Sequence, residues 1–164
     1  MKNNVVKKWR VGILMLSMVF LMLVSTLAQA DHEQLIMGRS TEAFPETMSA
    51  LQEEIRKAGY TISIVQRVDV GLTGMGFKTD KYRVVFFGKP EEIKNLPKKH
   101  PELTPYLPLA IAIFAEADET ILTAMSPHFI ESDYAPDKNG ELYAILQKWQ
   151  QDMQTIIENI SHLE

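Results

Sequence analysis

The segment from Tyr82 to Pro90, with the sequence YRVVFFGKP, constrains the fold of this chain most. Its β-branched and aromatic residues predict a buried central strand. Gly88 is free to adopt a positive φ, and Pro90 has no amide hydrogen to donate to a ladder, so the strand is expected to leave the sheet sharply here. The chain should therefore be organised around a β-sheet that has this segment at its centre.

The first 30 residues have the pattern of a bacterial signal peptide. They carry four basic residues and no acid, residues 11–30 are uncharged, and Ala28-Gln29-Ala30 matches a small-residue cleavage site. This predicts cleavage near Ala30 and a periplasmic or secreted protein. The alternative is an uncleaved inner-membrane anchor, because residues 11–30 are long enough to span a bilayer.

Charge and cysteine content exclude several classes of function. Without residues 1–30 the net charge falls from −4 to about −8, which disfavours partners such as nucleic acid or anionic lipid. The absence of cysteine excludes disulfides, a thiol nucleophile and thiolate metal sites. The remaining length suits one α+β domain, residues 31–140, followed by an amphipathic helix over 141–164.

Hydrophobic periodicity and turn residues predict the order β-α-β-β-α-β-β-α. The connections favour hairpins, so we expect an α+β two-layer sandwich whose sheet is largely antiparallel or mixed, with helices packed on one face. Residues 71–76, which contain three glycines, are expected to be a mobile connection, and Pro97, Pro101, Pro105 and Pro108 to break the chain after a short helix. The expected strands are 34–39, 60–69, 82–88, 109–116 and 120–125, and the expected helices are 44–58, 91–96 and 141–163.

The terminal helix carries a wide apolar stripe that includes Trp149 and Met153. Such a stripe has two interpretations. It covers the sheet as a structural element, or it docks a protein partner or a second copy of the chain.

Four short motifs, in this order and spacing, resemble the domain-of-unknown-function 302 family over roughly Leu35 to Ile130. They are the helix from Phe44 that closes at Gly59, the strand ending Phe87-Gly88-Lys89-Pro90, the Leu107-Pro108-Leu109 start of the next strand, and the hairpin ending at Ser126-Pro127. The resemblance implies a compact α/β sandwich that is often a homodimer. It also implies export for some members and a gene neighbourhood of sulfur oxidation for others, but no catalytic residue. The terminal helix is then expected to be an addition to the family's domain.

Lys89 is where the chain departs from the family, which usually has Asn between this glycine and proline. A lysine at the end of a strand is a candidate for holding an anionic ligand, together with Gly88. The backbone around Gly74 and Gly76 is a second candidate, as an anion-binding nest, although it lacks the spacing of a nucleotide-binding loop.

The other chemistry-bearing residues show no established motif. A metal site would require His100 and His128 to converge with Glu131 or Asp133, and no metal-binding spacing supports it. No nucleophile turn surrounds a serine, and no cofactor motif is present, so no catalytic residue and no cofactor are predicted.

The sequence therefore predicts an exported, non-enzymatic domain that binds a small ligand or a periplasmic protein, with no nucleic-acid partner. It would contact a membrane only if the first segment stayed uncleaved. The alternative, from the resemblance alone, is an enzyme or accessory factor in sulfur-compound metabolism.

Overall fold

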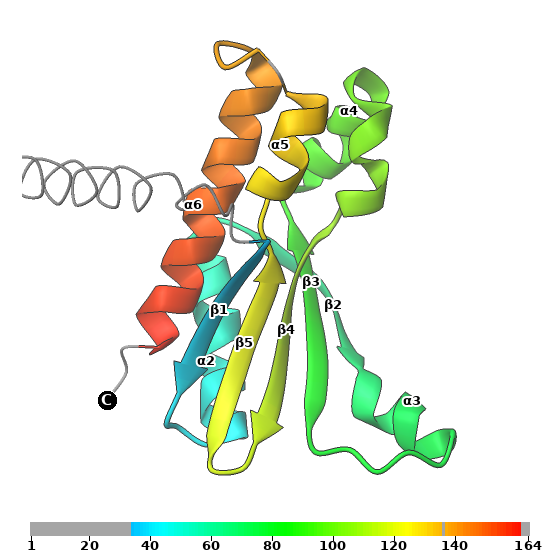
Figure 1. Ribbon diagram of the computed structural model, residues 1–164, viewed down its shortest axis with the longest axis vertical. Helices are drawn as coiled ribbons and strands as arrows, with labels where there is room; N and C mark the ends of the chain where they lie inside the picture. Colours follow the sequence, from blue (N-terminus) through cyan, green and yellow to red (C-terminus); the bar gives the residue numbers. More distant parts are fainter. Residues whose placement is uncertain (1–33, 136, 162–164) are drawn as a thin grey trace, which may run out of the picture. The chain divides into compact units, whose positions relative to one another are not determined.

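The computed structural model describes residues 34–135 and 137–161. The predicted signal peptide and residues 162–163 of the predicted terminal helix lie outside these residues. The described chain forms one five-stranded sheet in the order β1-β5-β4-β3-β2, and every neighbouring pair is antiparallel (Figure 1). The strands are β1 (Leu35–Ser40), β2 (Thr61–Arg67), β3 (Tyr82–Gly88), β4 (Leu109–Glu116) and β5 (Glu119–Met125).

Two long helices, α2 (Phe44–Lys57) and α6 (Glu141–Ser161), pack against one face of the sheet and against each other (Figure 1). The alternation of β4 explains this arrangement, because Leu109, Ile111 and Ile113 point into the helical layer and are buried. The predicted α+β two-layer sandwich is confirmed.

The terminal helix α6 is part of the core. Leu146, Trp149, Met153, Ile157 and Ile160 of its predicted stripe are all buried. The helix lies close to β1 because Gly38 has no side chain: a Cβ there would lie 2.1 Å from Ser161 Oγ. The first interpretation of the stripe is thus correct, and these residues are not free to dock a partner.

Two predictions about local structure were wrong, and one helix was not predicted. Residues within the glycine-rich segment form α3 (Val68–Gly74), not an irregular connection, because Asp69 pairs with Arg83 of β3 and accepts a hydrogen bond from the Val70 amide. Pro97 lies inside α4 (Pro90–Lys99), and the next prolines lie within and beside a 3₁₀ helix, η1 (Pro101–Tyr106). A further helix, α5 (His128–Tyr134), was not predicted because its seven residues are too few to show a periodic pattern.

The segment expected at the centre of the sheet lies one strand away from it. β3 is flanked by β4 and by the edge strand β2, and β4 is the middle strand. Gly88 does end β3, but not through a positive φ, which is found at Gly59 and Gly76. Gly88 is required by close packing instead, since a Cβ there would lie 2.5 Å from Ile93 Cδ1 of α4.

No helix within the described ranges has both the length and the apolar character needed to cross a bilayer.

Candidate functional site

An apolar cavity of about 400 Å³ lies at the end of the sheet that carries η1 and α5. On the face opposite the helical layer, its floor has Ala110 and Ala112 of β4 beside Val84 and Phe86 of β3. The cavity also reaches the helical side of this end of the sheet, where Leu109 and Ala124 line it. Because alanine side chains are short, the middle strand does not fill the space above itself. The sheet therefore provides a hollow floor with larger apolar side chains at its side.

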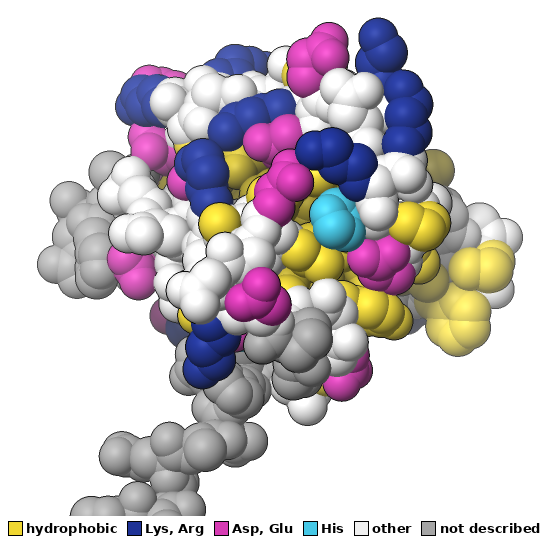
Figure 2. Space-filling model, turned by 90° about the horizontal axis from the view of Figure 1, so that it is seen from above, with side chains coloured by type: hydrophobic (Ala, Val, Ile, Leu, Met, Phe, Trp, Pro, Cys, Tyr) yellow, Lys and Arg dark blue, Asp and Glu magenta, His cyan; other side chains and the backbone are white. Residues whose placement is uncertain are grey.

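Two short helical segments and α6 provide the rest of the wall. Pro105 and Tyr106 come from η1, Ile130 from α5, and Trp149 and Met153 from α6. The rings of Tyr106 and Tyr134 meet edge to face with centroids 6.4 Å apart, which joins η1 to α5. In a view onto this end of the molecule, hydrophobic side chains reach the surface between charged ones (Figure 2).

Thr123 of β5 is a polar residue in this largely apolar lining. Its Oγ1 is buried and has no hydrogen-bond partner among the described residues. Ser126, which also lines the cavity, donates a hydrogen bond of 2.8 Å from Oγ to Gln150 Oε1. Two buried side-chain atoms of the described residues lack a hydrogen-bond partner, Thr123 Oγ1 and His128 Nε2, and of these only Thr123 lines the cavity.

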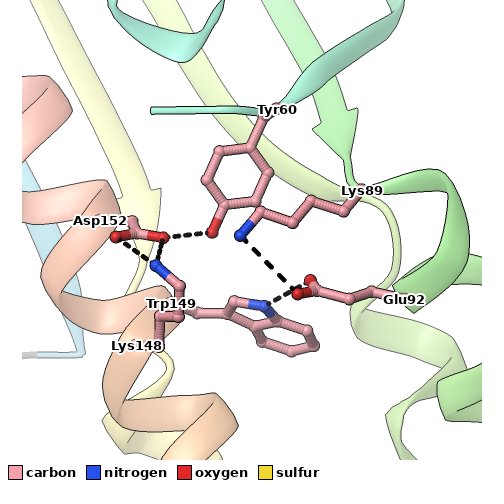
Figure 3. Close-up of polar contacts among 6 residues, drawn as sticks. All are labelled: Tyr60, Lys89, Glu92, Lys148, Trp149 and Asp152. Atoms are coloured by element: carbon pink, nitrogen blue, oxygen red, sulfur yellow. Dashed lines mark hydrogen bonds and ion pairs between the residues drawn. The ribbon is translucent and has the colours of Figure 1, made fainter. Parts of the chain in front are cut away.

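A polar network holds Trp149 in the cavity wall (Figure 3). Trp149 donates a hydrogen bond of 3.2 Å from Nε1 to Glu92 Oε2 of α4, and Lys89 Nζ lies 3.8 Å from Glu92 Oε1. The Lys89 ammonium also lies 4.8 Å from the centre of the Tyr60 ring, within the range of a cation–π contact. These contacts connect the end of β3 and the start of α4 to the middle of α6.

The same network continues through the Tyr60 hydroxyl, which donates a hydrogen bond of 2.6 Å to Asp152 Oδ2 (Figure 3). Lys148 Nζ lies 2.7 Å from the same oxygen. Burial of the phenol, and then its hydrogen bond to Asp152, raise the pKa of Tyr60 above its ordinary value. The phenol therefore stays protonated and acts as a donor that fixes α6 to the start of β2.

The structure places the predicted anion-binding residue Lys89 inside this network. Its charge is shared between Glu92 and the Tyr60 ring, and its side chain is 28% exposed. Gly88 is buried beneath Ile93. An anion at Lys89 would have to compete with the Glu92 carboxylate, so the arrangement favours a structural role for this lysine.

Gly74 and Gly76 do not join Lys89 in one site. They belong to the connection that contains α3 and enters β3 at Tyr82, whereas Gly88 and Lys89 lie at the other end of that strand (Figure 1). Gly74 is the last residue of α3, and Gly76, with φ of +88°, follows it. The two halves of the predicted ligand site are therefore separated by the length of β3.

The two candidate metal ligands each lie beside a separate carboxylate. His100 Nδ1 is 3.2 Å from Glu102 Oε1, and His128 Nε2 is 3.7 Å from Glu131 Oε2. In the part of the chain that the structure describes, no group of three or more His, Asp or Glu side chains is arranged to hold a metal ion.

The sequence did not reveal the cavity or Thr123 as part of it. The cavity is made by residues from β1, β3, β4, β5, η1, α5 and α6, which are distant in the sequence. One signal was present: Ala110 and Ala112 alternate with large apolar residues in β4, which marks a strand face without bulky side chains.

Comparisons with known proteins agree on one family. The family model described as "Domain of unknown function DUF302" matches residues 37–160, so the match includes almost all of α6 rather than ending near Ile130. The crystal structure of the uncharacterized conserved protein DUF302 from Bacillus stearothermophilus superposes with a TM-score of 0.68 at 14% identity, covering 78% of this chain and 98% of that chain. A search of curated proteins found no significant match.

Proposed function

Since the chain belongs to the family of the domain of unknown function DUF302, which has no assigned activity, we propose a function from the geometry. The protein is a non-enzymatic domain that binds a small apolar molecule in the cavity beside Ala112. The observation that carries the proposal is the cavity itself. Its volume of about 400 Å³ lies within the range of roughly 300–1,000 Å³ that is usual for small-molecule sites.

The composition of the lining supports an apolar ligand. Aliphatic, proline and aromatic side chains dominate, and none of the described residues that line the cavity is charged. The Trp149 ring is held by its hydrogen bond to Glu92, so this part of the wall is preorganised. A preformed apolar wall loses little conformational entropy when a ligand binds.

Titration of the full-length protein with N-phenyl-1-naphthylamine, a neutral dye whose fluorescence rises in apolar surroundings, tests the proposal. Ala112→Leu fills the floor of the cavity and is expected to weaken dye binding at least tenfold. The matched control is Ala144→Leu, the same change at an exposed position of α6. Equal affinities in all three proteins would show that the dye binds elsewhere, for example at the apolar segment 11–30, and would refute the site.

We also propose that the domain is exported and that residues 1–30 direct this export. The support is the basic, apolar and small-residue order of that segment. N-terminal sequencing of protein recovered from the bacterial periplasm is expected to begin near Asp31. Protein that keeps Met1 and sediments with membranes would favour the anchored alternative.

A second candidate function is self-association through the sheet face opposite the helices. Leu35 and Met37 of β1, Met125 of β5 and Ile64 of β2 are each more than half exposed, and such an apolar surface suits an interface with a second copy. Leu35 and Met125 also line the cavity, so a second copy on this face would cover part of it. Light scattering on wild type and Met37→Glu tests this homodimer, because a charge on that face should reduce the dimer mass to that of a monomer. A role in sulfur-compound metabolism stays a prediction from the resemblance.

A further inference from the structure

The cavity is electrically neutral even though charged residues lie close to it. Glu92 and Lys89 are paired with each other behind Trp149, and Asp152 is paired with Lys148. None of these charges belongs to the described lining. A carboxylate, phosphate or ammonium that entered the cavity would lose its hydration and gain no opposite charge in return. The site therefore selects against charged ligands.

Thr123 adds a single polar requirement. It lies on the middle of β5, between Ala112 of β4 and Met37 of β1 in the strand register. Its hydroxyl has no partner among the described residues, although the side chain lines the cavity. A buried hydroxyl without a hydrogen bond is unfavourable, so a ligand that satisfies it gains affinity.

The Thr123 hydroxyl can reach a ligand without backbone movement. A rotation about Cα–Cβ from one staggered rotamer to the next carries the hydroxyl to the position of the methyl group and the methyl group to the position of Hβ. The residue paired with Thr123 on β4 is Ala112, whose side chain is a single methyl group. Ser126 and Thr123 both line the cavity, but the Ser126 hydroxyl already donates to Gln150. Thr123 is therefore the one of these two residues whose hydroxyl remains available to a ligand.

We infer that the natural ligand is an uncharged molecule with an apolar body and one hydroxyl group, which forms a hydrogen bond with Thr123 Oγ1. This inference rests on the proposed function, because it specifies the ligand class of the same cavity. A hydroxyl is the group that fits best, since it both donates and accepts, as the threonine hydroxyl does.

Three probes of one shape test the inference at neutral pH: naphthalene, 1-naphthol and 1-naphthoate. Calorimetric titration of the full-length protein is expected to show 1-naphthol binding about three- to tenfold more tightly than naphthalene, the range that one hydrogen bond supplies. The ionised 1-naphthoate is expected to bind much more weakly than both. In Thr123→Val the preference for 1-naphthol should disappear while naphthalene binds as before, and Thr61→Val, at an exposed position of β2, should keep the preference.

The outcomes separate this inference from the proposed function. If naphthalene binds in an Ala112-dependent way but 1-naphthol has no advantage, or keeps its advantage in Thr123→Val, the hydroxyl-bearing ligand class is wrong and the apolar site stands. Tightest binding of 1-naphthoate overturns the ligand class as well. If none of the probes binds, and N-phenyl-1-naphthylamine does not bind either, the proposed function itself is refuted.

Discussion

The Tyr60 hydroxyl donates a hydrogen bond of 2.6 Å to the carboxylate of Asp152, a residue 92 positions later in the sequence. Tyr60 precedes β2, an edge strand, and Asp152 lies in the middle of α6. The Tyr60 ring is buried and meets Phe87 edge to face at 5.3 Å. This pair therefore joins the terminal helix to the edge of the sheet formed by β2.

Tyr60→Phe is expected to lower the free energy of unfolding by about 1–3 kcal/mol, the usual effect of losing a hydrogen bond to a charged group. The ring contact with Phe87 is kept, so the decrease in the free energy of unfolding reports the contribution of the hydroxyl alone. Urea denaturation followed by circular dichroism measures it. Tyr143→Phe, where no hydrogen bond of the hydroxyl is found among the described residues, is the matched control, and an equal loss in both variants would contradict the role of the Asp152 contact.

Stability should fall as pH rises above about 10, the pKa of tyrosine in an unfolded chain. Burial and the Asp152 contact raise the pKa of Tyr60 in the folded protein, so the unfolded state loses the phenol proton first. Alkali then favours unfolding, by at most about 1.4 kcal/mol per pH unit for one proton. Urea titrations between neutral and alkaline pH should show a shallower decline in Tyr60→Phe than in wild type, and parallel declines would exclude Tyr60 as the source.

Gly88→Ala should destabilise the protein by about 1–3 kcal/mol, as overpacking of a core does. The new methyl group would lie 2.5 Å from Ile93 Cδ1 and 2.9 Å from Ile93 Cγ1. A double-mutant cycle with Ile93→Ala measures the coupling by thermal unfolding. The second substitution should recover part of the loss, whereas strictly additive effects would show that Gly88 is needed for another reason.

Asp69→Asn is expected to loosen α3 and leave the sheet intact. The ion pair with Arg83 joins this short helix to β3, and the hydrogen bond from Arg83 lowers the pKa of the Asp69 carboxyl, so the pair persists at neutral pH. Hydrogen exchange of the amides of residues 68–74 should speed up, while that of β4 should not change. Asp118→Asn, in the exposed hairpin turn, is the control, and unchanged exchange in α3 would show that the ion pair does not hold it.

Much of the fold was predictable because it rests on local patterns. The strand alternation of residues 109–116 and the stripe of α6 depend only on the period of a strand or helix. The seven-residue helices were not predictable in this way, and α3 is joined to β3 by the ion pair of Asp69 with Arg83. A glycine-rich sequence favours no helix by itself, so a tertiary contact decides the conformation there.

The candidate site was less predictable than the fold. Lys89 and Gly88 were candidates for binding an anion because they stand at a strand end. In the structure, Lys89 contacts Glu92 and the Tyr60 ring, and Gly88 packs under Ile93. Thr123 showed no sequence signal, because an unsatisfied hydroxyl is recognisable only when its surroundings are known.

The sequence alone thus determined the elements that bury a continuous apolar face: the strands, the two long helices and the family to which they belong. Tertiary structure decided which strand became central, how α6 joined the core, and where space was left unfilled. The physical reason is that periodicity acts over a few residues, whereas a cavity is the volume that side chains from distant segments fail to fill.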